Sequence, residues 1–92
     1  MNNEINKPLD TIRDGSLKAT IWKNPGKDGK LPHYSVDLTW SYKDEAGIWK
    51  DTNSFSFFEL LRIGCLAEIS YNEVLIHRAK DRAESEVSGT AA

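Results

Sequence analysis

Two histidines and one cysteine are the residues of this chain best suited to catalysis or to metal binding. Cys65 lies in an apolar segment that predicts a helix, where a structural thiol is the usual role. His33 opens a predicted strand and His77 lies near the end of the predicted helix, and neither has an orienting partner at a recognisable spacing. The paired spacings of a zinc site are also missing. We therefore expect no enzymatic activity, no metal, no cofactor and no small-molecule substrate.

The segment NPGKDGKLP, residues 24–32, combines glycines and lysines in a way that invites comparison with a phosphate-binding loop. The spacing of a Walker motif is absent, and no helix is predicted to follow the segment. Its prolines and glycines indicate a loop between two strands.

Basic side chains interleaved with tryptophan are the stronger chemical signal. Lys and Arg neutralise backbone phosphates and Trp rings stack on bases, so this mixture on one surface is typical of nucleic-acid binding. The net charge is −2, but residues 11–50 carry seven basic and five acidic side chains, whereas residues 51–92 carry four and seven. A local positive face is compatible with that distribution. The candidate binding residues are Arg13, Lys18, Thr20, Trp22, Lys43 and Lys50. The alternative interpretation is an ordinary solvated face with one exposed Trp.

Strands are needed to position these residues. The stretch HYSVDLTWSYK, residues 33–43, alternates strictly and predicts a strand with an apolar face of Tyr34, Val36, Leu38, Trp40 and Tyr42. The stretch TIRDGSLKATIWK predicts a hairpin closed by a type I′ turn at Asp14 and Gly15. A four-residue loop at 44–47 is expected to join residues 33–43 to a last strand, IWKDTNSF.

The strand register decides which side chains share a face. We expect Arg13 opposite Ser16 in the first hairpin, and Tyr42 opposite Trp49 with Ser41 opposite Lys50 in the second. This register turns the aromatic stripe of residues 33–43 toward the core and puts the six candidate residues on the uncovered face. A slip of one residue would exchange the faces of the last strand.

A helix is predicted after the strands. Ser56 and Glu59 form a capping box, and the helix is expected to run to about Arg82. Its broad apolar stripe, expected to lie on the sheet, contains Phe57, Leu60, Leu61, Gly64, Ala67, Tyr71, Val74 and Leu75. A narrower stripe contains Phe58, Cys65, Ile69 and Ile76. One sheet needs only one apolar helix face, so we expect the narrower stripe to form a homodimer interface. A foreign partner or a strongly curved sheet is the alternative.

The predicted fold class is α+β: a four-stranded antiparallel β-meander followed by one long C-terminal α-helix. A single domain is expected at 8–82, with flexible tails at 1–7 and 83–92. A 92-residue chain has a small core, which also favours a dimer. The sequence has no apolar run long enough for a membrane span and no signal peptide, and its lone cysteine fits a reducing compartment, so we expect a cytoplasmic protein.

The segments RDGSLKATIWK, YSVDLTWSYKDEAGIWKD and SFSFFELLRIGCLAEI together resemble the positive cofactor four (p15) transcriptional coactivators and the related Whirly proteins. The resemblance covers residues 9 to about 80, as a pattern of elements. It implies a dimer that binds single-stranded DNA on its sheet surfaces, here through Arg13, Lys18, Trp22, Lys43 and Lys50. The negative net charge and the long loop at 24–32 depart from the pattern of that family. The same segments also resemble small bacterial or mobile-element proteins of unassigned function.

Two functional hypotheses follow from the sequence. The first is a non-enzymatic, sequence-nonspecific binder of single-stranded DNA, with RNA as the alternative ligand. The second is a small protein-interaction module, such as a phage- or plasmid-encoded accessory or inhibitor protein, acting through the narrower helix stripe or a sheet edge. The oligomeric state of the pure protein discriminates between them, because a stable dimer covers the narrower stripe.

Overall fold

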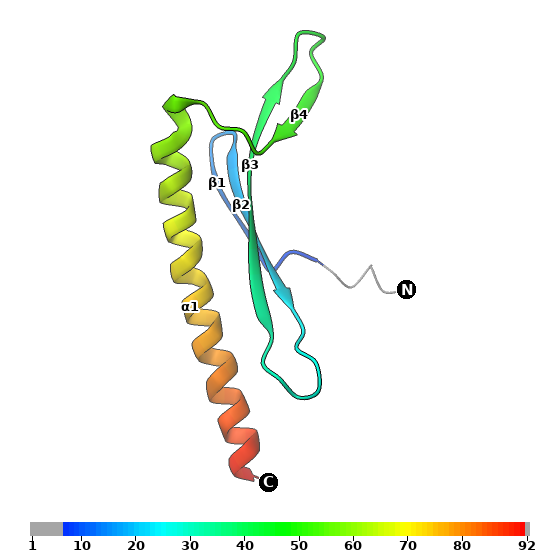
Figure 1. Cartoon of the computed structure of the whole chain (residues 1–92), viewed down its shortest axis with the longest axis vertical. Coiled ribbons are helices and arrows are strands. Elements are labelled where there is room, and N and C mark those ends of the chain that lie inside the picture. The colour runs from blue at the N-terminus through cyan, green and yellow to red at the C-terminus, as the bar shows by residue number, and fades with distance from the viewer. Residues whose placement is uncertain (1–6, 92) are drawn as a thin grey trace.

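The computed structural model describes residues 7–91 and has four strands followed by one helix. The elements are β1 (Asp10–Asp14), β2 (Leu17–Asn24), β3 (His33–Lys43), β4 (Trp49–Thr52), the 3₁₀ turn η2 (Phe57–Glu59) and α1 (Leu60–Ala91). The strands form one antiparallel sheet in the order β1-β2-β3-β4. Figure 1 shows α1 lying along one face of the sheet, with the β3–β4 hairpin projecting beyond the start of the helix. The predicted α+β fold is confirmed.

The first hairpin closes through Gly15 and Ser16 rather than through Asp14 and Gly15. Asp14 pairs with Leu17 and Arg13 pairs with Lys18, so the predicted pairing of Arg13 with Ser16 is wrong. Gly15 has φ +62°, which suits a two-residue turn with glycine in its first position. The partner of each β1 residue shifts by two positions, and because side chains alternate with a period of two, the predicted faces of β1 and β2 survive.

The second hairpin differs from its prediction by one residue, and there the faces do change. Lys43 pairs with Trp49 and Tyr42 with Lys50, instead of Tyr42 with Trp49. The cause is a shorter loop: the Gly47 amide donates to the Asp44 carbonyl at 3.0 Å, and Gly47 has φ +82°. This is a type I turn followed by a left-handed glycine. The amide of Ile48 donates to the Asp44 carboxylate at 2.9 Å, and this bond is the main cause of the lowered pKa of Asp44.

The core lies between β2 and the first half of α1. Leu17, Ala19 and Ile21 on β2 are fully buried, and Ile63 and Leu66 on α1 are buried as well. The hydroxyl of the buried Ser70 donates to the Leu66 carbonyl at 2.8 Å, which satisfies it within the helix. This core includes the partly buried Val36, Leu38, Trp40 and Phe55, as expected of the stripe on β3.

The face of α1 that meets the sheet is not the predicted one. Leu61 is 85 % exposed and Tyr71 64 % exposed, although both belong to the stripe expected on the sheet. The first half of α1 is apolar almost all the way round, so helical periodicity alone could not select the sheet-facing side. The choice depends on Ile63 and Leu66, which form one buried cluster with Leu17 and Ala19 of β2.

Two polar contacts hold the helix to the sheet, one near its start and one in its second half. Near its start, Arg62 donates to the carboxylate of Asp14 at 3.1 Å and to the Asp14 carbonyl at 3.0 Å. In its second half, Asp81 accepts hydrogen bonds from the Tyr34 hydroxyl and from Lys23, the latter at 3.2 Å. The Tyr34 hydroxyl, followed by Lys23, lowers the pKa of Asp81, and Asp81 raises the pKa of Lys23. Burial and Asp81 together raise the pKa of Tyr34.

The ends of α1 also differ from expectation. The side chains of Ser56 and Glu59 bond to each other instead of forming a reciprocal capping box, and the chain makes the 3₁₀ turn η2 before the α-helix begins. At its other end α1 continues past Arg82 to Ala91, since no proline interrupts the segment. Of the predicted tails, residues 1–6 and 92 lie outside the described part of the chain. In that part, no helix is long and apolar enough to cross a membrane.

Candidate nucleic-acid interface

The sheet face opposite α1 carries the candidate binding residues, and we call it the open face. Strand pairing puts five of the six predicted residues there: Arg13, Lys18, Thr20, Trp22 and Lys43. Arg13 and Lys18 are direct cross-strand partners, and Thr39 lies beside Lys18 on β3. The hydroxyl groups of Thr20, Thr39 and Ser41 follow the same face.

Lys50 is predicted on the open face, but the structure puts it on the other one. It pairs with Tyr42, whose side chain belongs to the helix side of the sheet, and its ammonium lies 3.4 Å from the Asp44 carboxylate. The one-residue shift of the β3–β4 register is the cause. Lys50 therefore belongs to the hairpin turn and not to the candidate interface.

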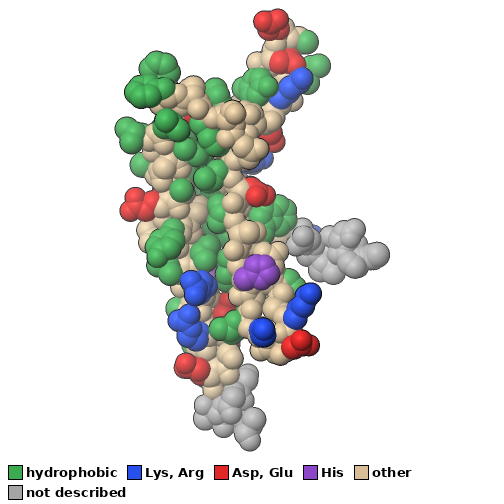
Figure 2. All heavy atoms as spheres, in the orientation of Figure 1, with side chains coloured by type: hydrophobic (Ala, Val, Ile, Leu, Met, Phe, Trp, Pro, Cys, Tyr) green, Lys and Arg blue, Asp and Glu red, His purple; other side chains and the backbone are tan. Residues whose placement is uncertain are grey.

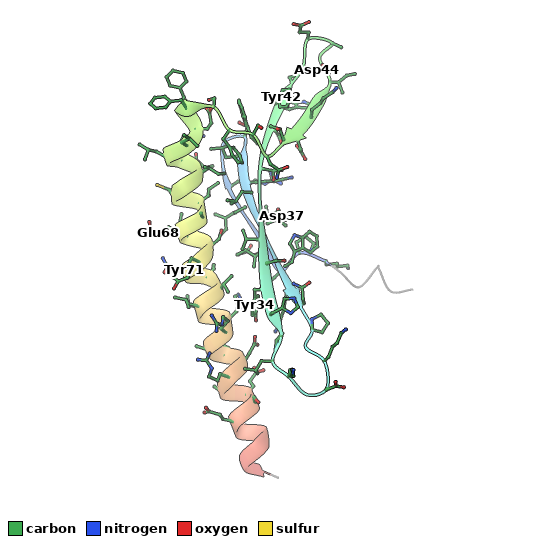
Figure 3. All side chains as sticks on the ribbon, viewed as in Figure 1. Tyr34, Asp37, Tyr42, Asp44, Glu68 and Tyr71 are labelled. Atoms are coloured by element: carbon green, nitrogen blue, oxygen red, sulfur yellow. The ribbon has the colours of Figure 1, made fainter. Side chains whose placement is uncertain are left out.

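Trp22 is held in a fixed orientation on the open face. Its indole N–H donates to the Asp37 carboxylate at 3.0 Å. Asp37 is the cross-strand partner of Thr20, two positions before Trp22 on β2, so the bond runs diagonally between the two strands. Figure 3 shows Asp37 on the central part of β3, whereas Tyr34 on the same strand points toward α1. Trp22 is half-buried, so it remains partly accessible to solvent. Such an anchored ring is suited to stacking because little side-chain entropy is lost on binding.

Trp49 is a second aromatic residue of the open face, and the sequence-based register missed it. It pairs with Lys43, is 63 % exposed, and has the Lys43 ammonium 5.3 Å from the centre of its ring. This is a cation–π geometry. The signal for it was present in the sequence: Asp44 followed three residues later by Gly47 is typical of a type I turn with a left-handed glycine, which sets the observed register.

The open face has a small positive excess. Its cations Arg13, Lys18 and Lys43 face two carboxylates, Asp37 and Asp51. Both carboxylates are engaged locally: Asp37 accepts from Trp22, and Asp51 accepts from the Ser41 hydroxyl at 2.6 Å. The three cations have no ion pair with an acidic group among the described side chains. They are therefore available to an anionic ligand.

Three of the predicted dimer-interface residues, Cys65, Ile69 and Ile76, lie on the side of α1 away from the sheet, which we call the outer face, and Phe58 lies in the turn η2 at its start. Phe58 is 80 % exposed, Ile69 47 % and Ile76 53 %, and Cys65 is exposed as well. Of the residues predicted to meet the sheet, Leu61 and Leu75 also lie on the outer face, whereas the exposed Leu60 and Tyr71 lie on one flank of the helix. Figure 2 shows apolar side chains gathered along the helix and at its start.

Neither a metal site nor a relative adds to this description. Within residues 7–91, no group of three or more His, Cys, Asp and Glu side chains is arranged to hold a metal ion. Comparison of the chain with family models, with curated proteins and with solved structures finds no match in any of the three.

Proposed function

We propose that this chain is a non-enzymatic, sequence-nonspecific binder of single-stranded nucleic acid that acts as a cytoplasmic homodimer. The observation that carries the proposal is the composition of the open face, where Trp22 and Trp49 lie among Arg13, Lys18 and Lys43. Flat rings for bases and cations for phosphates are the two components that single-strand binding needs.

The placement of the two tryptophans favours a strand over a small ligand. Trp22 lies beside Ser35 and Trp49 beside Lys43, eight positions further along β3. At the rise of a β-strand this corresponds to about 27 Å. One base cannot contact both rings, so each serves a different nucleotide of the same strand. Lys18 and the hydroxyl groups of Thr39 and Ser41 lie between them.

A second copy of the chain is the proposed occupant of the outer face of α1. Phe57 and Phe58, in the turn η2 that precedes α1, are each 80 % exposed. At about 200 Å² per ring these two side chains present about 320 Å² of surface. The largest apolar patch of a typical monomer is about 300–600 Å². Four aliphatic side chains with exposures from 41 % to 85 % lie within about 120° of one another around α1 and extend the patch: Leu61, Ile69, Leu75 and Ile76. A second copy would cover this surface.

Binding of a fluorescent oligo-dT, followed by anisotropy at low salt, tests the proposal. We expect Trp22→Ala and Trp49→Ala each to weaken binding by about 1–3 kcal/mol if a base stacks on the ring. Lys43→Gln should weaken binding and reduce its salt dependence, because one phosphate is no longer neutralised. Lys50→Gln is the matched control, since it removes the same charge from the same hairpin on the other face. Absence of binding at micromolar protein would refute the proposal.

The protein-interaction module is the second candidate, and the outer face of α1 is the observation that favours it. If the pure protein is a stable monomer by sedimentation, the exposed apolar side chains remain uncovered by a second copy. That result would favour a foreign partner at this face and would weaken the case for nucleic acid.

A further inference from the structure

The end of the molecule formed by the β2–β3 loop and the second half of α1 contains a groove that the open face does not include. It has a volume of about 290 Å³ and is lined by Pro32, His33, Tyr34, Val74 and Arg78. A smaller hollow of about 80 Å³ adjoins it and adds Asp81 and Arg82 to the lining. Figure 2 shows Lys and Arg side chains on both the helix and the loop at this end, on either side of a histidine.

The charge at the groove is positive. Arg78 and Arg82 are four residues apart, so they lie one turn apart on the same side of α1. Neither has an ion pair with an acidic group among the described side chains. Two like charges at this spacing destabilise a helix slightly, and a bound anion would relieve the repulsion. The lining carboxylate, Asp81, is already compensated by Lys23 at 3.2 Å and by the Tyr34 hydroxyl.

His33 connects the groove to the open face. It is the first residue of β3 and pairs with Asn24. Its side chain belongs to the open face, because it is two positions from Ser35, the cross-strand partner of Trp22. It also lines the groove together with Arg78. Near His33, the edge of β3 that faces away from β2 has no paired strand among the described residues, because β4 pairs only with the segment from Trp40 to Lys43. A strand that passes Trp22 can therefore cross this edge without meeting another described strand.

We propose that the groove is a phosphate subsite, in which Arg78 and Arg82 bind the backbone phosphates of a single strand leaving the open face past His33. The proposal rests on the proposed function, since it extends the path of the same ligand. Arg is suited to the role because its planar guanidinium offers several donors to the oxygens of one phosphate. The subsite adds affinity without sequence preference, because phosphates are the same at every base.

Three variants and oligo-dT of two lengths test the subsite. With a 20-nucleotide oligomer at low salt, Arg78→Gln and Arg82→Gln should each weaken binding about tenfold, as loss of a charged hydrogen bond does. The negative slope of log K against log salt should become shallower by about 0.7 for each phosphate that the variant no longer binds. Lys80→Gln is the matched control: Lys80 is exposed and is rotated by about 200° from both arginines around α1, so its loss should leave affinity and slope unchanged. With a four-nucleotide oligomer, too short to extend beyond the open face, neither arginine variant should have an effect.

The outcomes separate this subsite from the open face. If Trp22→Ala and Lys43→Gln weaken binding while both arginine variants behave like Lys80→Gln, the subsite is refuted and the proposed function stands. If the unmodified protein binds no oligomer, the proposed function fails and the subsite fails with it. Inorganic phosphate, titrated at constant ionic strength and followed by NMR of the arginine side chains, distinguishes the strand from free phosphate. Saturation of Arg78 and Arg82 below about 1 mM, a Kd that corresponds to about −4 kcal/mol, would overturn the assignment to a strand.

Discussion

Replacing Asp81 with Ala tests how the second half of α1 is held to the sheet. Ser70 is buried, and none of the residues from Tyr71 to Glu86 is buried. Beyond it, Asp81 connects α1 to β2 and β3 through Lys23 and Tyr34. Removing the Asp81 carboxylate should release the second half of the helix while leaving the core of Leu17, Ile63 and Leu66 in place.

The expected cost follows from the two bonds. The Tyr34 hydroxyl donates to a charged acceptor, which stabilises by about 1.5–3 kcal/mol. The Lys23 side chain is 42 % exposed, so its ion pair adds no more than about 1 kcal/mol. Part of the loss is recovered as water solvates the released groups, and we expect Asp81→Ala to cost about 2 kcal/mol. In a domain of this size that lowers Tm by about 8–16 °C.

Urea unfolding and amide hydrogen exchange provide the measurement. Asp81→Ala should remove exchange protection from amides of α1 beyond Ser70, whereas Tyr34→Phe should cost about 1 kcal/mol because the pair of Lys23 and Asp81 remains. The double variant should cost less than the sum of the two, since both single variants remove the same hydrogen bond. Glu84→Ala, an exposed acidic residue on the same helix, is the control. A cost within 0.5 kcal/mol of that control, or unchanged protection, would refute the reasoning.

The same carboxylate gives a pH dependence of known sign. The pKa of Asp81 is lowered in the folded protein, chiefly by the Tyr34 hydroxyl. The stabilisation by Asp81 is therefore complete above the pKa of the unfolded state, near 3.8. It is lost as the pH falls below 3.8 and through the lower pKa of the folded state. Asp81→Asn should lack this part of the acid sensitivity, which a urea titration at pH 6 and at pH 3 would show.

Two further predictions concern stability and assembly. Gly15→Ala should destabilise the protein by about 1–2 kcal/mol in thermal unfolding, since Gly15 has φ +62° and an added Cβ would lie 2.9 Å from the Arg62 guanidinium; a rise in Tm would contradict this explanation. Leu61→Glu should convert a dimer into monomers and abolish the dependence of Tm on protein concentration, because Leu61 is 85 % exposed on the outer face of α1. The control is Glu84→Gln, which removes a charge from an exposed position of the same helix eight residues beyond Ile76, and sedimentation of Leu61→Glu as a dimer would exclude this interface.

The fold could be predicted from the sequence because each element has a clear local pattern. Strict alternation defines β3, and a change of period after Ser56 defines the helix. The predicted pairing of β1 with β2 is two positions away from the true register, yet the faces are right because side chains repeat every two residues. Trp22 and its neighbours Arg13 and Lys18 are therefore predicted on the open face despite the wrong turn.

The errors arise where a one-residue choice or a rotation decides the outcome. The loop between Asp44 and Ile48, which joins β3 to β4, has three residues, 45–47, instead of the four predicted at 44–47. This difference puts Trp49 on the open face in place of Lys50. The rotation of α1 could not be predicted because its first turns are apolar on all sides, and the packing of Ile63 and Leu66 on β2 decides it. The groove at Arg78 joins residues more than forty positions apart, which no local pattern indicates.

The unpaired edge of β3 has a consequence for solubility. A strand edge with free N–H and C=O groups is a template for pairing with other chains, and proteins protect such edges with charge, proline or a side-chain cap. Here Asn53 donates its amide to the Leu38 carbonyl at 3.1 Å, Pro32 precedes the strand, and Asp37 lies on its exposed stretch. A strand of eleven residues rich in aromatic and β-branched side chains would otherwise be prone to stack into fibres. We therefore expect these three residues to protect the edge of β3 from pairing with other chains. Substitutions at Asn53 or Asp37 should appear first as loss of soluble protein during expression.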